Sequence, residues 1–207
     1  MLIQKFGIKL RTISSGDIET IRLWRNKDFV RYNMHYTKII HPQQQSQWFS
    51  ELDKTCNLYF IVIHHENEIG LINLKDINWQ TKEAEAGIFI GEENYLNTIT
   101  PVLATIALMD FSFHILKLES LKAKINRKNP EAIRFNQSIG YVYKKDIDKD
   151  FTYYKCTKEL FSNATTSLRP TLDKFNVADI ELKVTNTEIG QFRLDIANQK
   201  DFKVSIL

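Results

Sequence analysis

Hydrophobic and polar residues follow two different periods along this chain of 207 residues, and together they predict a mixed α/β fold. Alternation of period two, or an unbroken apolar run, predicts strands, and apolar residues at helical spacing predict helices. The predicted strands are residues 3–13, 58–64, 69–77, 82–91, 120–126, 141–147 and 152–158. The predicted helices are residues 18–25, a segment after Pro42, residues 101–116 and residues 130–139.

Two of these helices begin with capping signals. Ser14 and Asp17 have the spacing of a capping box ahead of the first helix. Asn129 and Pro130 suit the N-cap and the first position of the last helix, and Gly140 follows its final turn. The local sequence therefore predicts where both helices begin.

The composition of the sequence changes after Phe161. Residues 162–167 are a polar run typical of a linker. Short strand candidates follow at residues 180–184, 191–196 and 202–206. We therefore predict a main domain over residues 1–161 and a linker with a small β-rich extension over residues 162–207. The extension carries no chemical motif, and self-association into a homodimer is the role we hypothesise for it.

Composition and charge narrow the classes of function. Hydrophobic residues make up 43% of the chain, enough for a sizeable core. The net charge of +3, without a dense basic run, argues neither for nor against a nucleic-acid partner, and we expect none. The segment 101–116 is short for a bilayer span, and the N-terminus lacks the apolar stretch of a signal peptide. The two cysteines, Cys56 and Cys156, favour a reduced compartment. We expect a cytoplasmic protein without a membrane partner.

Residues 82–140 form a strand–helix–strand–helix unit. The strand 82–91 leads into the apolar helix 101–116, which returns to the strand 120–126. A helix N-terminus presents unpaired N–H groups and the positive end of the helix dipole. The start of this helix is therefore a natural site for the pyrophosphate of a cofactor.

The residues of this unit resemble the GNAT family of acetyl-CoA-dependent N-acetyltransferases. The similarity lies in AEAGIFIGEENY over residues 84–95 and in Asn-x-x-Ala-Ile-x-Phe-x-x-x-x-Gly-Tyr over residues 129–141. Upstream, LWRN at residues 23–26 and QWF at residues 47–49 also match. The resemblance covers about residues 8–160. Within the family it lies near the Rim-type N-terminal acetyltransferases and the N-acetyltransferase of pseudaminic acid biosynthesis.

The resemblance implies a splayed mixed sheet of six to seven strands flanked by helices. The sheet opens between its fourth and fifth strands, the pantetheine arm of acetyl-CoA lies in the split, and no metal is needed. The cofactor-binding residues it implies are Ile88, Phe89 and Ile90 through their backbone, Leu96, Asn97, Thr98, Ile99, Thr100 and Pro101 toward the phosphates, and Asn129 and Phe135 on the far side.

The loop at the expected phosphate site departs from the family pattern Gln/Arg-x-x-Gly-x-Gly/Ala. Residues 96–101 contain no glycine and no basic residue, and Pro101 lacks an N–H. Thr100 is a candidate N-cap, and the hydroxyls of Thr98 and Thr100 are candidate replacements for the missing donors. The departure leaves two alternatives to an ordinary acetyltransferase: an impaired GNAT-like binding or scaffolding module, or an acyltransferase that uses a carrier-protein donor.

Two residues are candidate catalytic groups. Glu85 lies mid-strand near the expected split, where it could deprotonate an ammonium, and the alternative is a solvated strand residue. Asn136 stands where many family members have a tyrosine that protonates the departing thiolate. An amide donates hydrogen bonds but is no general acid, so Asn136 is either a donor at the site or a structural amide.

An aromatic and cationic set is expected around the amine acceptor. The predicted acceptor-binding residues are Trp24, Arg25, Met34, His35 and Trp48. Arg25 could bind a phosphate or carboxylate bidentately, and a tryptophan could stack on a base or sugar. The alternative is that Trp24 and Trp48 are core residues of two amphipathic helices. We expect a small-molecule or peptide acceptor, either a nucleotide-linked amino sugar or a protein N-terminus.

Overall fold

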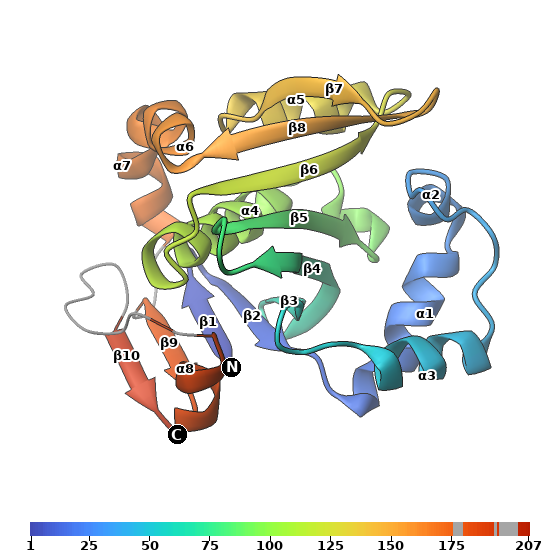
Figure 1. Ribbon diagram of the computed structural model, residues 1–207, viewed down its shortest axis with the longest axis horizontal. Coiled ribbons are helices and arrows are strands. Elements are labelled where there is room, and N and C mark those ends of the chain that lie inside the picture. Colours follow the sequence, from blue (N-terminus) through green and yellow to red (C-terminus); the bar gives the residue numbers. More distant parts are fainter. Residues whose placement is uncertain (176–179, 193, 195–202) are drawn as a thin grey trace.

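A computed structural model describes residues 1–175, 180–192, 194 and 203–207, and its centre is one sheet with helices around it (Figure 1). The sheet order is β10-β9-β1-β2-β3-β4-β5-β6-β8-β7. The strands are β1 (Leu2–Lys5), β2 (Ile8–Thr12), β3 (Leu58–His64), β4 (Asn67–Asn78), β5 (Glu83–Ile90), β6 (Ser120–Asn126), β7 (Val142–Asp146), β8 (Phe151–Thr157), β9 (Glu181–Val184) and β10 (Lys203–Ile206). The helices are α1 (Ile18–Asn26), α2 (Asp28–Arg31), α3 (Pro42–Glu51), α4 (Thr100–Asp110), α5 (Pro130–Ser138), α6 (Lys158–Thr165), α7 (Arg169–Leu172) and α8 (Asn186–Phe192).

The first strand segment is a hairpin, whereas the sequence predicted a single strand over residues 3–13. β1 and β2 pair antiparallel, with Lys5 opposite Ile8. Phe6 and Gly7 between them have φ values of 55° and 72°. Two consecutive positive φ values give the tight turn whose twist matches antiparallel strands, and glycine adopts such a φ without a steric cost.

The C-terminal extension joins the main sheet, which within the described residues has eight strands from the main domain, where six to seven were expected, and two from the extension. β9 pairs antiparallel with β1, and β10 pairs parallel with β9. The predicted linker 162–167 is wrong, because α6 continues to Thr165 and a 3-10 turn follows. Of the predicted strand 191–196, residues 191–192 end helix α8, while residues 193, 195 and 196 lie outside the described part. The first residue of the predicted strand 202–206 lies outside it too.

A buried ion cluster fastens this extension to α4. The Asp110 carboxylate is fully buried and accepts two hydrogen bonds from Arg169, at 2.7 and 2.8 Å. The Lys5 Nζ atom lies 2.7 Å from the same carboxylate. Burial alone would raise the pKa of Asp110, but the bonds from Arg169 and the charge of Lys5 outweigh it and hold that pKa below its ordinary value.

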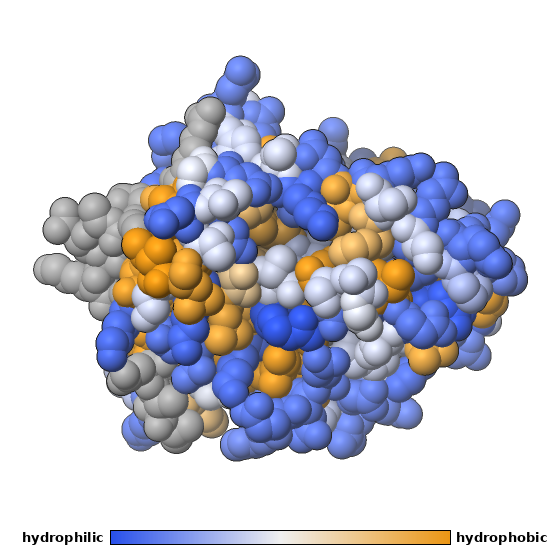
Figure 2. All heavy atoms as spheres, turned by 90° about the horizontal axis from the view of Figure 1, so that it is seen from below, coloured by the Kyte–Doolittle hydropathy of each residue, from blue (hydrophilic) through white to orange (hydrophobic). Residues whose placement is uncertain are grey.

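Two hydrophobic clusters occupy the two faces of the sheet. Neighbouring residues on β3 point to opposite faces, so Phe60 belongs to the larger cluster around α4 and Ile61 to the smaller one around α1. The larger cluster includes a π turn, residues 111–115, that continues α4 as predicted for the helix 101–116. The face seen in Figure 2 is mostly hydrophilic, with separate hydrophobic patches.

β5 and β6 are parallel neighbours that part after three paired positions. Their pairing ends at Glu85 opposite Lys122, while β5 continues to Ile90 and β6 to Asn126. The splayed mixed sheet is therefore confirmed, and the split lies between β5 and β6.

Candidate active site

A cavity of about 720 Å³ passes through the sheet where β5 and β6 part. One end is lined by residues of the α4 face, such as Ala132 and Phe135 of α5. The other is lined by residues of the α1 face, such as Trp48 and Tyr59. We call these the donor end and the acceptor end. A cavity of this size, lined from both faces of the sheet, can hold two reactants that meet at the split.

Most of the predicted site residues meet in this cavity. Those that line it are Arg25, Met34, His35, Trp48, Glu85, Ile88, Phe89, Ile90, Leu96, Pro101, Asn129, Phe135 and Asn136. They come from elements far apart in the sequence, and the split in the sheet brings them together. Trp24, Asn97, Thr98, Ile99 and Thr100 do not line it.

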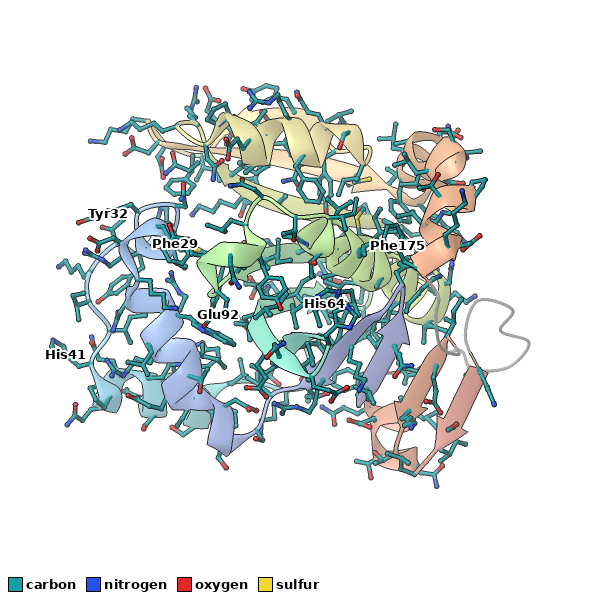
Figure 3. All side chains as sticks on the ribbon, turned by 180° about the vertical axis from the view of Figure 1, so that it is seen from behind. Phe29, Tyr32, His41, His64, Glu92 and Phe175 are labelled. Atoms are coloured by element: carbon teal, nitrogen blue, oxygen red, sulfur yellow. The ribbon has the colours of Figure 1, made fainter. Side chains whose placement is uncertain are left out.

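Trp24 is a core residue and not part of the acceptor cavity. Its side chain is 4% exposed, and its indole N–H donates to Glu92 Oε1 at 2.7 Å. Figure 3 shows Glu92 at the end of β5, facing α1. A Cβ atom on Gly91 would lie 2.1 Å from the Trp24 ring, so only glycine admits this packing. Trp24 thus fixes α1, and with it the neighbouring Arg25, against the end of β5.

At the start of α4, the N–H groups of Thr100 and Leu103 already have partners within the chain. The predicted N-cap at Thr100 is wrong, because Thr100 is the first residue of α4 and Ile99 is its N-cap; the Thr100 N–H donates to Thr98 Oγ1 at 3.2 Å. The Leu103 N–H donates to the Ile99 carbonyl, and Pro101 has no N–H. Asn97, Thr98 and Ile99 are exposed to solvent. Only the first and last residues of the loop, Leu96 and Pro101, reach the cavity.

Glu85 lies at the point where the strands part. Its side chain is 15% exposed, 2.8 Å from Lys75 Nζ, and accepts a hydrogen bond from the Tyr153 hydroxyl at 3.2 Å. Lys75 and Tyr153 thus hold the carboxylate in place at the junction of the two ends of the cavity, which Glu85 lines. Lys75 and Tyr153 were not predicted, because only the strand register brings them to Glu85.

Asn129 and Asn136 are both engaged on α5. Asn129 caps the helix as predicted, since its Oδ1 accepts the Ala132 N–H at 2.9 Å, and its Nδ2 donates to Asn33 Oδ1 at 3.1 Å. The Asn136 Nδ2 donates back to the Ala132 carbonyl at 2.8 Å. One of the two amide N–H groups of Asn136 thus bonds to its own helix, and the residue lines the cavity.

Arg25 brings an uncompensated cation to the acceptor end. Its Nη1 atom is buried and has no hydrogen-bond partner among the described residues. Its guanidinium lies over the Phe89 ring, 5.8 Å from the centroid. Burial lowers the pKa of Arg25, which stays charged because arginine's ordinary pKa is so high. Nearby, Trp48 meets Tyr59 edge-on at 5.2 Å, and burial raises the pKa of Tyr59 to about 12.

A loop over residues 32–37 roofs the acceptor end and touches the opposite arm of the sheet. Asn126 Nδ2 donates to the Tyr32 carbonyl at 3.3 Å, and His35 Nε2 lies 3.3 Å from Asp148 Oδ2. The His35 ring also meets Phe151 edge-on at 5.1 Å. Figure 3 labels Phe29 and Tyr32 at this corner. His35 and Met34 therefore reach the cavity from above the split.

Tyr59 and Tyr141 line the cavity, although the sequence did not single them out. Both resemble ordinary core aromatics in strand segments, so neither carries a separate signal. Within the described ranges no three His, Cys, Asp or Glu side chains gather into a metal site. No helix there has the length and apolar character needed to cross a bilayer.

Comparisons with known proteins agree on the family. The family model described as an acetyltransferase (GNAT) domain matches residues 8–142. The chain is 32% identical over 165 residues to the acetyltransferase PseH of Campylobacter jejuni serotype O:2, covering 77% of this chain and 99% of that protein. It is 27% identical over 146 residues to a spermidine N(1)-acetyltransferase of Vibrio cholerae, covering 70% and 84%. The structure of a spermidine N-acetyltransferase from Vibrio cholerae in complex with CoA and spermine aligns with a TM-score of 0.66 at 21% identity, covering 75% and 98%.

Proposed function

The chain belongs to the GNAT acetyltransferase family, and we propose that its acceptor is the amine of an anionic small molecule, a nucleotide-linked amino sugar. The enzyme transfers an acetyl group from acetyl-CoA to a primary amine. Arg25 carries the proposal for the acceptor, because its buried Nη1 has no partner within the described residues. An uncompensated buried charge is costly, so its partner is expected to arrive with the ligand.

The remaining acceptor-end residues suit such a molecule. A phosphate accepts the paired N–H groups of an arginine, and Trp48 and Tyr59 offer apolar faces to a base or a sugar ring. Met34 and His35 close the cavity from the roof. A polyamine would instead place its positive charges beside Arg25 and Lys75, where like charges repel.

At the donor end we assign the pantetheine arm to the free edge of β5 at Ile88–Ile90. Asn129 and Phe135 border it from α5, and Leu96 and Pro101 border it toward the phosphates. In the transfer step the amine attacks the thioester carbonyl at the split. We assign Glu85 as the group that accepts the proton lost by the nitrogen, and Lys75 holds its carboxylate at the split. Because the loop 96–101 has no glycine and no basic residue, and Pro101 has no N–H, we expect the phosphates to contribute little to donor affinity.

A panel of acceptors with acetyl-CoA as donor tests the proposal. The panel holds a UDP-linked 4-amino sugar, the same sugar without its nucleotide, spermidine and a peptide with a free N-terminus. We expect kcat/KM for the UDP-linked sugar to exceed that for spermidine by roughly 10²-fold, since a charge-assisted hydrogen bond contributes about 1.5–3 kcal/mol. Faster turnover of spermidine or of the peptide would overturn the proposed acceptor. Calorimetry with acetyl-CoA tests the donor separately, and failure to bind at millimolar concentration would favour a carrier-protein donor or a binding module.

We further propose residues 1–161 as the catalytic domain and residues 162–207 as an extension that serves as a dimer contact. β10 ends the sheet with Ile206 53% exposed and Leu207 74% exposed, and an apolar strand edge suits pairing with a second copy. Light scattering of the full chain and of the Ile206→Lys variant tests this, and an unchanged mass would contradict it. A cytoplasmic location is in keeping with the unpaired thiols of Cys56 and Cys156.

A further inference from the structure

The charged side chains that line the cavity do not balance. Arg25, Lys75 and Lys124 bring three positive charges, and Glu85 is the single carboxylate among the described residues that line it. Glu85 is paired with Lys75 at 2.8 Å, so two cations remain without an anion. Arg25 is already part of the proposed acceptor site. Lys124 is the cation to which that site gives no role.

Lys124 differs in its partners from a second lysine on the same face of β6. Ala123 and Ile125 belong to the cluster around α4, so the partly buried side chain of Lys124 between them points to the opposite, acceptor face. Lys122, two residues earlier, points the same way and contacts the Glu83 carboxylate at 2.7 Å. The Lys124 ammonium makes no hydrogen bond or ion pair with any residue in the described part of the chain.

An aromatic ring holds the Lys124 ammonium next to the loop that roofs the acceptor end. The Nζ atom lies over the ring of Phe151, 5.4 Å from its centroid, and the His35 ring of the roof meets the same ring edge-on at 5.1 Å. His35 has an anion of its own in Asp148, at 3.3 Å. The face of an aromatic ring attracts a cation without neutralising it, so Lys124 keeps its full charge for a ligand.

Arg25 and Lys124 approach the acceptor end from opposite walls of the split. The Arg25 guanidinium lies over Phe89 of β5, whereas Lys124 belongs to β6. The two strands pair last at Glu85 and Lys122, so Lys124 lies two residues and Phe89 four residues beyond the last pair. At about 3.3 Å per residue, their Cα atoms are about 7 and 13 Å beyond it. An acceptor with its amine at Glu85 therefore meets one cation on each side as it extends outward.

We propose that Lys124 binds one phosphate of a diphosphate in the acceptor while Arg25 binds the other. The diphosphate of a nucleotide-linked sugar carries two negative charges, which matches the two cations that the chain leaves without an anion in the cavity. A charge-assisted hydrogen bond to phosphate compensates each of them. The inference rests on the acceptor class proposed above, and it adds the residue by which the site recognises the second phosphate.

Calorimetry with UDP tests this without any reaction, because UDP carries the diphosphate and no amine. Lys124→Met should weaken UDP binding roughly 10-fold, the lower end of what a hydrogen bond between charged groups contributes. Lys124→Arg keeps the charge and should keep UDP affinity within about threefold of the wild type. Acetyl-CoA should bind equally to the wild type and to Lys124→Met, since Lys124 faces away from the donor end. Weaker binding of acetyl-CoA in place of UDP would assign Lys124 to the donor and overturn the inference.

Lys122→Met is the matched control, since Lys122 lies on the same strand and face but does not line the cavity. It should bind UDP as the wild type does. Equal losses of UDP affinity in Lys122→Met and Lys124→Met would show that the overall charge of this face is responsible, and the inference would be wrong.

The same titrations separate the role of Lys124 from the proposed acceptor. If Arg25→Met weakens UDP binding and Lys124→Met does not, the acceptor class stands and the role of Lys124 is wrong. If the wild type binds UDP no better than uridine, both proposals fail. The double variant of Arg25→Met and Lys124→Met should bind UDP more weakly than either single variant, because each cation binds its own phosphate. A double variant that binds UDP as well as Arg25→Met alone does would contradict the inference.

Discussion

Arg169 and Arg25 are both partly buried cations, but they differ in the partners that the chain supplies to them. Arg169 meets the fully buried Asp110 carboxylate with two hydrogen bonds, and Lys5 completes the cluster. Arg25 meets an aromatic ring, and its buried Nη1 has no partner among the described residues. The same side chain is an anchor where the chain supplies the anion, and a candidate binding group where it does not. This contrast underlies the acceptor we propose.

The largest effect is expected from breaking the anchor. Asp110→Ala leaves the charges of Lys5 and Arg169 without their common partner, and removing one member of a buried ion cluster costs about 3–5 kcal/mol. Urea unfolding followed by circular dichroism measures the loss. A loss under about 1 kcal/mol would show that solvent reaches the cluster, and the contrast with Arg25 would then be weaker than the burial suggests.

Arg25→Met should act in the opposite way on stability. Removing an unpaired buried charge is neutral or stabilising, so the free energy of unfolding should not fall. The same change should lower kcat/KM for the UDP-linked sugar by roughly 10²-fold, through the loss of a charge-assisted hydrogen bond. Turnover of the sugar without its nucleotide is the control and should change little. A variant that is destabilised with unchanged kcat/KM would make Arg25 a structural residue.

Local sequence signals predicted part of the fold, and the rest depends on contacts between residues far apart in the sequence. The capping box of Ser14 and Asp17 and the cap at Asn129 are confirmed. Each was predictable because its hydrogen bonds join residues within a single helical turn. The turn at Phe6 and Gly7 was missed, because the strand-like pattern runs through it. The polar run after Phe161 was taken for a linker, although Phe161 itself is buried and anchors α6.

In the candidate site, too, some residues were predicted from the sequence and their contacts were not. Arg25 and Glu85 were predicted to lie near the acceptor, and both line the cavity. The contact of Glu85 with Tyr153 was not predictable, because it joins residues 68 apart. The contact of Arg169 with Asp110 in the buried ion cluster likewise joins residues 59 apart.

A smaller change would displace Arg25 without altering it. In Gly91→Ala the new Cβ would lie 2.1 Å from the Trp24 ring, so α1 must shift, at a cost of about 1–3 kcal/mol in stability. Because Arg25 follows Trp24, KM for the acceptor should rise while the affinity for acetyl-CoA, measured by calorimetry, stays constant. Gly190→Ala is the control, since a Cβ there meets nothing within 4 Å and its helix should gain stability. Equal changes in the KM for the acceptor in Gly91→Ala and Gly190→Ala would show that the packing of Trp24 does not position Arg25.

The smallest effect should come from Glu83, a carboxylate that also has two cations but is partly exposed. Its side chain contacts Lys122 at 2.7 Å and also pairs with Lys155, and these bonds lower the pKa of Glu83 from 4.5 to about 2. A lowered folded-state pKa contributes stability that is present above pH 4.5 and is lost as the pH falls toward 2.

Solvent screens this site, so the wild type should exceed Glu83→Gln by only about 0.5–1 kcal/mol at neutral pH. The difference should shrink as the pH falls through the window from 4.5 toward 2, which thermal unfolding of both proteins at a series of pH values measures. A difference that persists unchanged at the lowest pH would arise from packing rather than from charge. A loss of stability as large as that of Asp110→Ala would mean that burial does not decide how much the ion pairs of Asp110 and Glu83 contribute. The buried, unpartnered Nη1 of Arg25 would then no longer indicate that a ligand supplies its partner.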